Sequence, residues 1–160
     1  IDGVVCRGGG GAAGEVGALD ILRWAKAPAI FTRHPDLPKG LPLIMAAEWV
    51  CSRMRGGDRE AARLVHQFAH DLAVGAAALV LTVDPDVLIL GGGISASADL
   101  WKEPFAEALA PLVLRMPELR VSQLGSRGVV EGAAWRGAQF LEAHSYSDYL
   151  LPAQSLTQYA

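Results

Sequence analysis

The pattern of apolar and polar positions divides the chain into helical segments joined by glycine turns and short apolar runs. Apolar residues recur at helical spacing over 43–54 and, with Asp58 as N-cap, from 59 to about 83. The second half of this longer helix is apolar almost all round, so we expect it in the centre of the domain. The same spacing predicts helices over 98–114 and 129–143.

A short apolar run between two of these helices is the clearest strand signal. Pro85 ends the preceding helix, and 87–90 is unbroken Val-Leu-Ile-Leu, which is typical of a strand covered on both faces. Gly91, Gly92 and Gly93 then permit a sharp turn, with Ser95 as the expected N-cap of the next helix. A strand, glycines and a helix N-terminus can present backbone N–H groups to a phosphate, but they can equally form a tight connection without a ligand.

The N-terminal segment combines a predicted strand with a glycine loop. Residues 1–7 are expected to form the strand, and four consecutive glycines at 8–11 then require a loop. The loop carries Glu15, preceded by Gly14 and followed two residues later by Gly17. A carboxylate held between glycines can accept hydrogen bonds from two hydroxyls, which suits a polyol or sugar. The alternative is a solvated loop glutamate.

The following stretch contains four prolines and no metal-ligand pattern. We expect a short helix or mixed structure over 18–27 and irregular chain over 28–42. His34 has no partner at ligand spacing, so it is predicted to lie at the surface. His66 and His70 lie one turn apart on the long helix without a third ligand, so no metal site is predicted there.

The C-terminal third predicts a second strand and a last helix. Alternation over 119–124 favours a strand near the sheet edge, and Gly132-Ala133-Ala134 gives the last helix a small-residue face for close packing. Residues 145–160 form a tail that docks or frays. Strands alternating with helices predict an α/β domain with a short sheet flanked by helices. The core face of the helix over 98–114 is predicted to contain Trp101, Phe105, Leu109 and Leu112.

Composition narrows the functional classes. The chain has 160 residues, of which 51% are hydrophobic and 19% charged, so one domain with a real core is expected. With a net charge of -3, the composition shows no sign of a basic surface for nucleic-acid binding. The longest apolar run, 73–83, is too short to span a membrane. Cys6 and Cys51 suit a reducing compartment, so a cytoplasmic location is predicted. A start at Ile1 without Met or a basic segment predicts a fragment without a signal peptide.

Four segments together resemble a known family. Residues 6–17 resemble its "G…GAAGE(I/V)GH" loop, and 57–61 its "GD..A" helix start. Residues 84–93 resemble "(N/D)P(E/D).(I/V).(L/I)GGG", and 124–134 its closing "LG….GAA". In this order and near this spacing, the set resembles the C-terminal half of ROK proteins, a family of bacterial repressors and sugar kinases.

The resemblance implies an actin-like ATPase (ribonuclease H-like, sugar-kinase) fold. Residues 1–144 would be its second lobe and 145–160 a tail. Glu15, with Gly14 beside it, would bond sugar hydroxyls. In kinase members, Gly91, Gly92 and Gly93 would lie near the adenosine of ATP.

Three departures bear on function. The family's zinc-binding and sugar-neighbouring histidine would fall at Ala18, and the cysteine cluster "C.CG..GC.E" is absent, so the zinc site is expected to be lost. Glu48 stands near the place of the cluster's glutamate, but its spacing is off. The catalytic aspartate and the phosphate-binding loop would belong to the other lobe, so no catalytic residue is expected in this chain.

Three functions follow from these features. The main hypothesis is the sugar-sensing, oligomerising (homodimeric) domain of a ROK transcriptional repressor, with operator DNA bound by an upstream domain and no membrane partner. Loss of the histidine favours it, because a kinase must orient its sugar tightly. This chain would then be no enzyme and need no cofactor. The alternative is the C-terminal half of a glucokinase-like sugar kinase that uses ATP and Mg²⁺, and a third is a domain that only dimerises.

Overall fold

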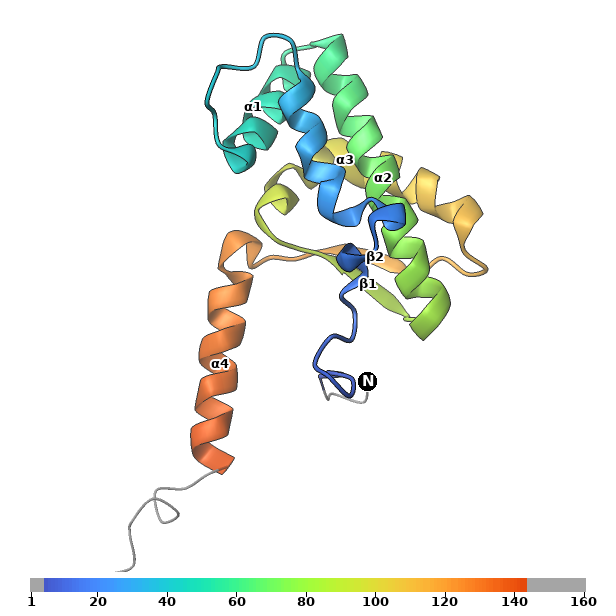
Figure 1. Cartoon of the computed structure of the whole chain (residues 1–160), viewed down its shortest axis with the longest axis vertical. Helices are drawn as coiled ribbons and strands as arrows, with labels where there is room; N and C mark the ends of the chain where they lie inside the picture. The colour runs from blue at the N-terminus through green and yellow to red at the C-terminus, as the bar shows by residue number, and fades with distance from the viewer. Residues whose placement is uncertain (1–4, 144–160) are drawn as a thin grey trace, which may run out of the picture.

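The computed structural model describes residues 5–143, which form an α/β fold with a two-stranded sheet and four α-helices within those residues (Figure 1). The elements in chain order are η1 (Val16–Ala18), η2 (Asp20–Leu22), η3 (Trp24–Arg33), α1 (Leu43–Arg55), α2 (Arg59–Val83), β1 (Val87–Leu90), η4 (Gly93–Ser97), α3 (Ala98–Leu109), η5 (Ala110–Leu112), β2 (Glu118–Val121), η6 (Gly125–Arg127) and α4 (Gly128–Ala143), where η denotes a 3-10 helix. The predicted helices over 43–54 and 59–83 and the strand over 87–90 are confirmed.

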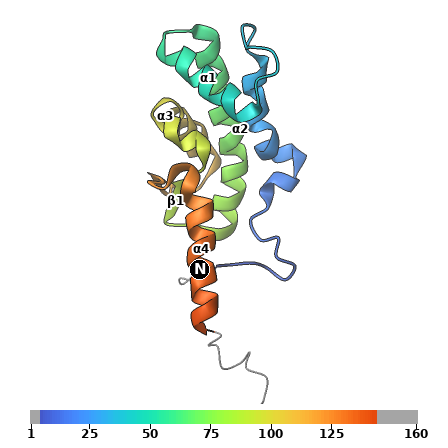
Figure 2. The same cartoon turned by 90° about the vertical axis from the view of Figure 1, so that its left-hand side faces the viewer.

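Helix α2 is the central element. It runs between η3 on one side and α3 on the other (Figure 2). Its predicted N-cap is confirmed, because Asp58 Oδ1 accepts hydrogen bonds from the N–H groups of Glu60 at 3.0 Å and Ala61 at 3.1 Å. By length and composition α2 could cross a membrane, yet half of its most apolar window is buried in this core. Such burial is how the central helix of a domain behaves.

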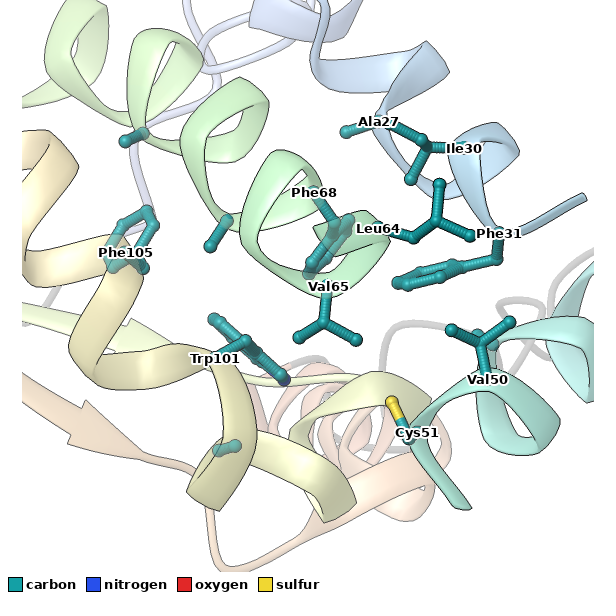
Figure 3. Close-up of a cluster of buried hydrophobic side chains, with 14 of the residues drawn as sticks. Ala27, Ile30, Phe31, Val50, Cys51, Leu64, Val65, Phe68, Trp101 and Phe105 are labelled. Carbon is teal, nitrogen blue, oxygen red and sulfur yellow. The ribbon is translucent and has the colours of Figure 1, made fainter. Parts of the chain in front are cut away.

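The core is a chain of aromatic contacts across α2 (Figure 3). The ring centroid of Phe68 on α2 lies 5.1 Å from that of Phe31 on η3 and 5.6 Å from that of Trp101 on α3. The ring centroids of Trp101 and Phe105 are 6.2 Å apart. The predicted burial of Trp101, Phe105 and Leu109 is confirmed. The predicted burial of Leu112 is wrong, because α3 ends at Leu109 and the following 3-10 turn leaves Leu112 exposed.

The sheet consists of β1 and β2 in parallel register, with Val87 opposite Glu118 and Leu90 opposite Val121. The second strand is shorter than the predicted 119–124, and it lies at an edge as expected. The prediction that both faces of 87–90 are covered is wrong, because Ile89 is 65% exposed. Among residues 5–143, the helices cover one face of β1, through Leu88 and Leu90.

The N-terminal third differs from prediction in two respects. The predicted strand at 1–7 is not formed over residues 5–7, which are irregular because no strand pairs with them in the described chain, and 1–4 lie outside the described residues. The stretch 28–33, predicted to be irregular, continues η3 through Pro28. The η3 turns bury Ala27, Ile30 and Phe31 on one face, and this burial outweighs the local effect of the proline.

His34 is buried rather than at the surface, so that prediction is wrong. The residue is 4% exposed, and its ring lies edge-on to that of Trp49, with 4.9 Å between the ring centroids. Nδ1 accepts a hydrogen bond from the Asp36 N–H at 3.2 Å, and Nε2 lies 3.3 Å from Asp58 Oδ2. The histidine therefore joins the end of η3 to the N-cap of α2.

Helix α4 stands away from the rest of the structure (Figure 1). Its main contacts within the described residues are with η6, and Gly132, Ala133 and Ala134 are exposed. The close packing predicted for these small residues is therefore absent from this part of the chain. The predicted tail, 145–160, lies outside the described residues.

Candidate functional site

The glycine turn after β1 lies at the carboxyl edge of the sheet. Because β1 and β2 are parallel, their C-terminal ends meet at the same edge, where ligands of open α/β sheets bind. Gly92 has φ 86° and ψ -177°, a conformation that L side chains rarely adopt. A Cβ added to Gly91 would lie 3.5 Å from the Cβ of Ser122, just after β2. The two strand ends are thus brought side by side.

Hydrogen bonds fix the shape of this turn. The carbonyl of Gly92 accepts from the backbone N–H of Ser95 at 3.1 Å and from its Oγ at 2.7 Å. Trp101 Nε1 donates to the carbonyl of Ile94 at 3.2 Å, which ties the turn to the core. Ser95 was predicted as a helix N-cap, but it lies inside η4 and bonds backward instead. The result is an exposed glycine turn on a rigid base.

A cavity of about 560 Å³ opens beside the turn. Its walls come from η3, α1, α2, β1, η4 and α3, and they include Gly91 and Gly93. Glu48, Cys51 and Ser97 are the polar or thiol-bearing side chains among the lining residues. Burial raises the pKa of the Cys51 thiol, so it stays neutral near pH 7. The apolar lining residues include Trp24, Leu72, Ala76, Leu88, Trp101 and Phe105.

The predicted sugar-binding loop lies elsewhere in the described chain. Gly14 has φ 86°, which glycine adopts without strain, and Glu15 is exposed directly before η1. Neither residue lines the cavity beside Gly91 and Gly93. The structure therefore brings Gly91 next to Ser122, but it does not place Glu15 at this cavity, and the sugar contact of Glu15 stays a prediction.

Sequence reasoning missed Ser122 and Ser97 near the glycine turn, and it named Glu48 only as an off-spacing counterpart of the family's glutamate. Ser122 follows the second strand, and its position could have been found from the rule that parallel strands end at one edge. Ser97 and Glu48 line the cavity from η4 and α1. No pattern in the sequence reports that these two segments meet, because their approach depends on packing between helices far apart in the chain.

Comparison with known proteins decides the family. Residues 41–144 match the model of the ROK family. The chain is a member of the ROK family. The family resemblance inferred from the glycine motifs is confirmed.

Three curated relatives of the chain are named as sugar kinases. The chain is 32% identical to the N-acetyl-D-glucosamine kinase of Pasteurella multocida over 93 residues, which are 56% of this chain and 30% of that protein. It is 29% identical to the enzyme of the same name from Mannheimia succiniciproducens over 162 residues, which are 83% of this chain and 52% of that protein. The chain thus spans about half, or less, of the length of these curated relatives.

A solved ROK structure supports the fold. The crystal structure of a ROK family glucokinase from Streptomyces griseus in complex with glucose and AMPPNP matches with a TM-score of 0.57. The match covers 74% of this chain and 41% of that one at 22% identity. The predicted α/β fold, a lobe of the actin-like sugar-kinase type, is confirmed.

These relatives correct two functional expectations. The expectation that this ROK chain is no enzyme is wrong, because the relatives are named as sugar kinases. The same finding favours the kinase alternative over the regulator hypothesis. Repression and a homodimer stay predictions.

The residues present do not fit the zinc site of the ROK family. Ala18 stands where the zinc-binding histidine is expected, and it has no ligand atom. Cys51 lies in the core on α1, beside Ser97. Of the two ring nitrogens of His34, Nδ1 faces the N–H of Asp36 and Nε2 faces the carboxylate of Asp58. Within residues 5–143, no group of three or more His, Cys, Asp or Glu side chains could hold a metal ion. His66 and His70 therefore have no third ligand in this part of the chain.

Proposed function

We propose that this chain is the C-terminal lobe of an ATP-dependent kinase that phosphorylates a hexose or N-acetylhexosamine. The observation that carries the proposal is the similarity of the chain, at 27% to 32% identity, to three proteins named as N-acetyl-D-glucosamine kinases. The exposed glycine turn at the carboxyl end of β1 supports it, because such an edge is where nucleotides bind to open sheets.

The turn supplies the nucleotide side of the proposed site. Without side chains, Gly91, Gly92 and Gly93 let the adenosine of ATP approach the backbone closely. The bonds from Ser95 and Trp101 hold the turn in one shape before ATP arrives, which reduces the ordering cost of binding. ATP, taken with Mg²⁺, is the phosphoryl donor and leaves as ADP.

Glu15 supplies the sugar side. Its ionised carboxylate is an acceptor with two oxygens, so it can receive hydrogen bonds from two neighbouring sugar hydroxyls. In the reaction a sugar hydroxyl oxygen forms a bond to the γ-phosphorus, and the bond from that phosphorus to the β–γ bridging oxygen breaks. The hydroxyl proton goes to a base that lies outside this chain. We place the reaction in the cytoplasm, where ATP is available, and in a homo-oligomer.

The test is sugar-dependent ADP release by the full-length protein that contains this chain. It uses glucose, N-acetylglucosamine and other hexoses with Mg-ATP. We expect Glu15→Gln to lower kcat/KM for the preferred sugar by about 100-fold or more, since oriented hydrogen bonds to the reacting sugar are lost. Glu107→Gln is the matched control, because Glu107 is an exposed glutamate on α3.

Two outcomes contradict the proposal. Sugar binding without any ADP release would restore the sugar-sensor hypothesis. If the protein neither binds nor turns over any of the sugars, only the hypothesis of a domain that dimerises would remain. A Glu15→Gln variant as active as Glu107→Gln would remove Glu15 from the sugar site while leaving the kinase itself in place.

A further inference from the structure

The turn between η2 and η3 contains a residue in an uncommon backbone conformation. Arg23 has φ 57° and ψ -1°, and among the non-glycine residues of 5–143 only Asp84 also has a positive φ. A residue with a side chain keeps such angles where the surrounding structure holds it, and residues of this kind gather at functional sites. Arg23 lies in the segment that follows Glu15, so the contacts that hold it bear on the proposed sugar side.

Arg23 is bound to a largely buried carboxylate on α2. Its Nη1 lies 3.4 Å from Asp71 Oδ1, and the Asp71 side chain is only 13% exposed. The same oxygen accepts a hydrogen bond from Gln67 Nε2 at 3.0 Å, and His70 Nδ1 lies 3.7 Å from it. A carboxylate with so little access to water needs hydrogen-bond partners from the protein. Arg23 supplies one of them from a different element of the chain.

The residue after Arg23 packs on the same helix. A Cβ added to Gly75 of α2 would overlap the ring of Trp24, and it would lie 3.2 Å from the Cβ of Trp24. The indole therefore lies directly against the helix backbone. Its ring also lines the cavity beside the glycine turn. Arg23 and Trp24 thus fix the turn between η2 and η3 to α2 through one polar and one apolar contact.

A series of backbone hydrogen bonds connects this turn to Glu15. The carbonyl of Glu15 accepts from the N–H of Ala18 at 3.1 Å. Further bonds of the same three-residue spacing, at 3.0 to 3.1 Å, run from Leu19 to Val16, from Leu22 to Leu19 and from Arg23 to Asp20. Short turns of this type fix each residue relative to the one three positions before it. The position of Glu15 relative to α2 therefore depends on where Arg23 is held.

We propose that Arg23 is a positioning residue for the sugar. Its bond to Asp71 holds the segment from η1 to η2 on α2 and thereby sets the place of the Glu15 carboxylate. This inference rests on the proposed function, in which Glu15 binds the sugar. Helix α2 also supports the glycine turn, because Phe68 contacts Trp101, whose indole donates to a carbonyl of the turn. One helix thus holds the sugar side and the nucleotide side, which favours a fixed geometry between them.

The first test is steady-state kinetics of the full-length protein that contains this chain, with its preferred sugar and Mg-ATP. Arg23→Met keeps the length of the side chain and removes the guanidinium. We expect it to raise the KM for the sugar by about 10-fold or more, because Glu15 is no longer oriented toward the sugar hydroxyls. The KM for ATP should change by less than about 2-fold, since the glycine turn keeps its own supports. Arg23→Lys retains a cation for Asp71 and should restore the KM for the sugar to within about 3-fold of wild type.

Lys26→Met is the matched control for the removal of a cation. Lys26 Nζ lies 2.8 Å from Asp20 Oδ2, so this ion pair belongs to the same segment, but both side chains are exposed and neither lies on α2. Exposed pairs contribute little, so the KM for the sugar should stay within about 2-fold of wild type. An Arg23→Met variant that matches Lys26→Met, or one that raises both KM values equally, would overturn the proposal.

The second test is backbone ¹⁵N relaxation of the full-length protein, which requires no sugar and no turnover. In the wild type we expect order parameters of about 0.8 or more for the amides of Ala18 and Leu19, and values below about 0.6 in Arg23→Met. The Ala61 amide, bonded to Asp58 at the start of α2, is the internal control and should not change. Equal order parameters for Ala18 and Leu19 in the two proteins would overturn the proposal.

The two measurements separate this proposal from the kinase function. Loss of order around η1 in Arg23→Met, in a protein that releases no ADP with any sugar, would contradict the kinase and still support Arg23 as the anchor of the Glu15 segment. Full kinase activity and an unchanged KM for the sugar in Arg23→Met would leave the kinase in place and overturn the role of Arg23.

Discussion

Arg115 Nη2 lies 2.9 Å from Asp84 Oδ1, and Nη1 of the same guanidinium lies 3.2 Å from Asp86 Oδ1. Asp84 caps α2 with a left-handed φ of 42°, and Asp86 directly precedes β1. Arg115, in the segment before β2, thus binds both aspartates of the segment that joins α2 to β1. The hydrogen bonds to Asp84 raise the pKa of Arg115, which stays charged at any ordinary pH.

We expect Arg115→Met to lower the melting temperature of the chain by no more than about 4 °C, because exposed ion pairs contribute little. The difference from wild type should shrink as NaCl is raised from 0.05 to about 1 M, since salt screens exposed charges. Thermal melts followed by circular dichroism measure both. A difference that does not change with salt would show that Arg115 acts through packing of its aliphatic part.

Asp58 predicts a pH-dependent contribution to stability. Its pKa is lowered, first by the hydrogen bond from the Ala61 N–H and also by Arg53 and His34. A carboxyl with a lowered folded pKa stabilises the fold above its unfolded pKa of about 3.9, and this stabilisation is lost as pH falls through the folded pKa. Asp58→Ala should therefore lower the melting temperature at pH 7, and its difference from wild type should diminish below about pH 4.

Asp58→Asn is the control for this prediction, since asparagine caps helices well but does not titrate. It should be more stable than Asp58→Ala at pH 7. Melting curves from pH 3 to 7 make the comparison. An Asp58→Ala deficit of the same size at pH 3 and pH 7 would contradict the role of the ionised carboxylate.

Gly75 allows α2 to pack closely on η3. A Cβ at this position would overlap the ring of Trp24. Gly75→Ala should therefore destabilise the chain by about 1–3 kcal/mol despite the better helix propensity of alanine. Gly132→Ala on α4 is the control, because a Cβ there meets nothing within 4 Å. Urea unfolding of both variants measures the effect, and equal midpoints would contradict the close contact.

Gly92 predicts an effect on nucleotide binding. Gly92→Ala must carry a side chain at φ 86°, which costs about 1–3 kcal/mol or reshapes the turn. In the proposed kinase it should raise the KM for ATP by about 10-fold or more. Gly40→Ala, at φ 78° in a loop away from the cavity, is the matched control for strain alone. An equal KM for ATP in the two variants would contradict a role of the Gly92 turn in nucleotide binding.

Local signals in the sequence were sufficient for the elements that depend on neighbours in the chain. The cap at Asp58, the periodicity of α2 and the stop at Pro85 each act within a few residues, and all appear where predicted. The glycine motifs led to the correct family and fold. The preference for the regulator over the kinase rested on the missing histidine at Ala18, whereas the relatives named as sugar kinases favour the kinase alternative.

The failures concern residues whose environment is built by distant segments. His34 is enclosed by Trp49 and Asp58, and nothing in its own surroundings reports either contact. Ile89 belongs to a run that is apolar enough for two covered faces, yet the described residues cover only one. An apolar run reports the burial that a strand requires. It does not report whether the covering segment belongs to the same stretch of chain.

The position of α4 has a consequence for cooperativity. Val129 is 82% exposed and Trp135 65%, and the helix has its main contacts with the short η6. A 16-residue helix without tertiary support is marginal in water. We therefore expect α4 to open as a unit of its own while the core around α2 stays folded. One free energy of unfolding would then describe that core, and α4 would have a separate and smaller one.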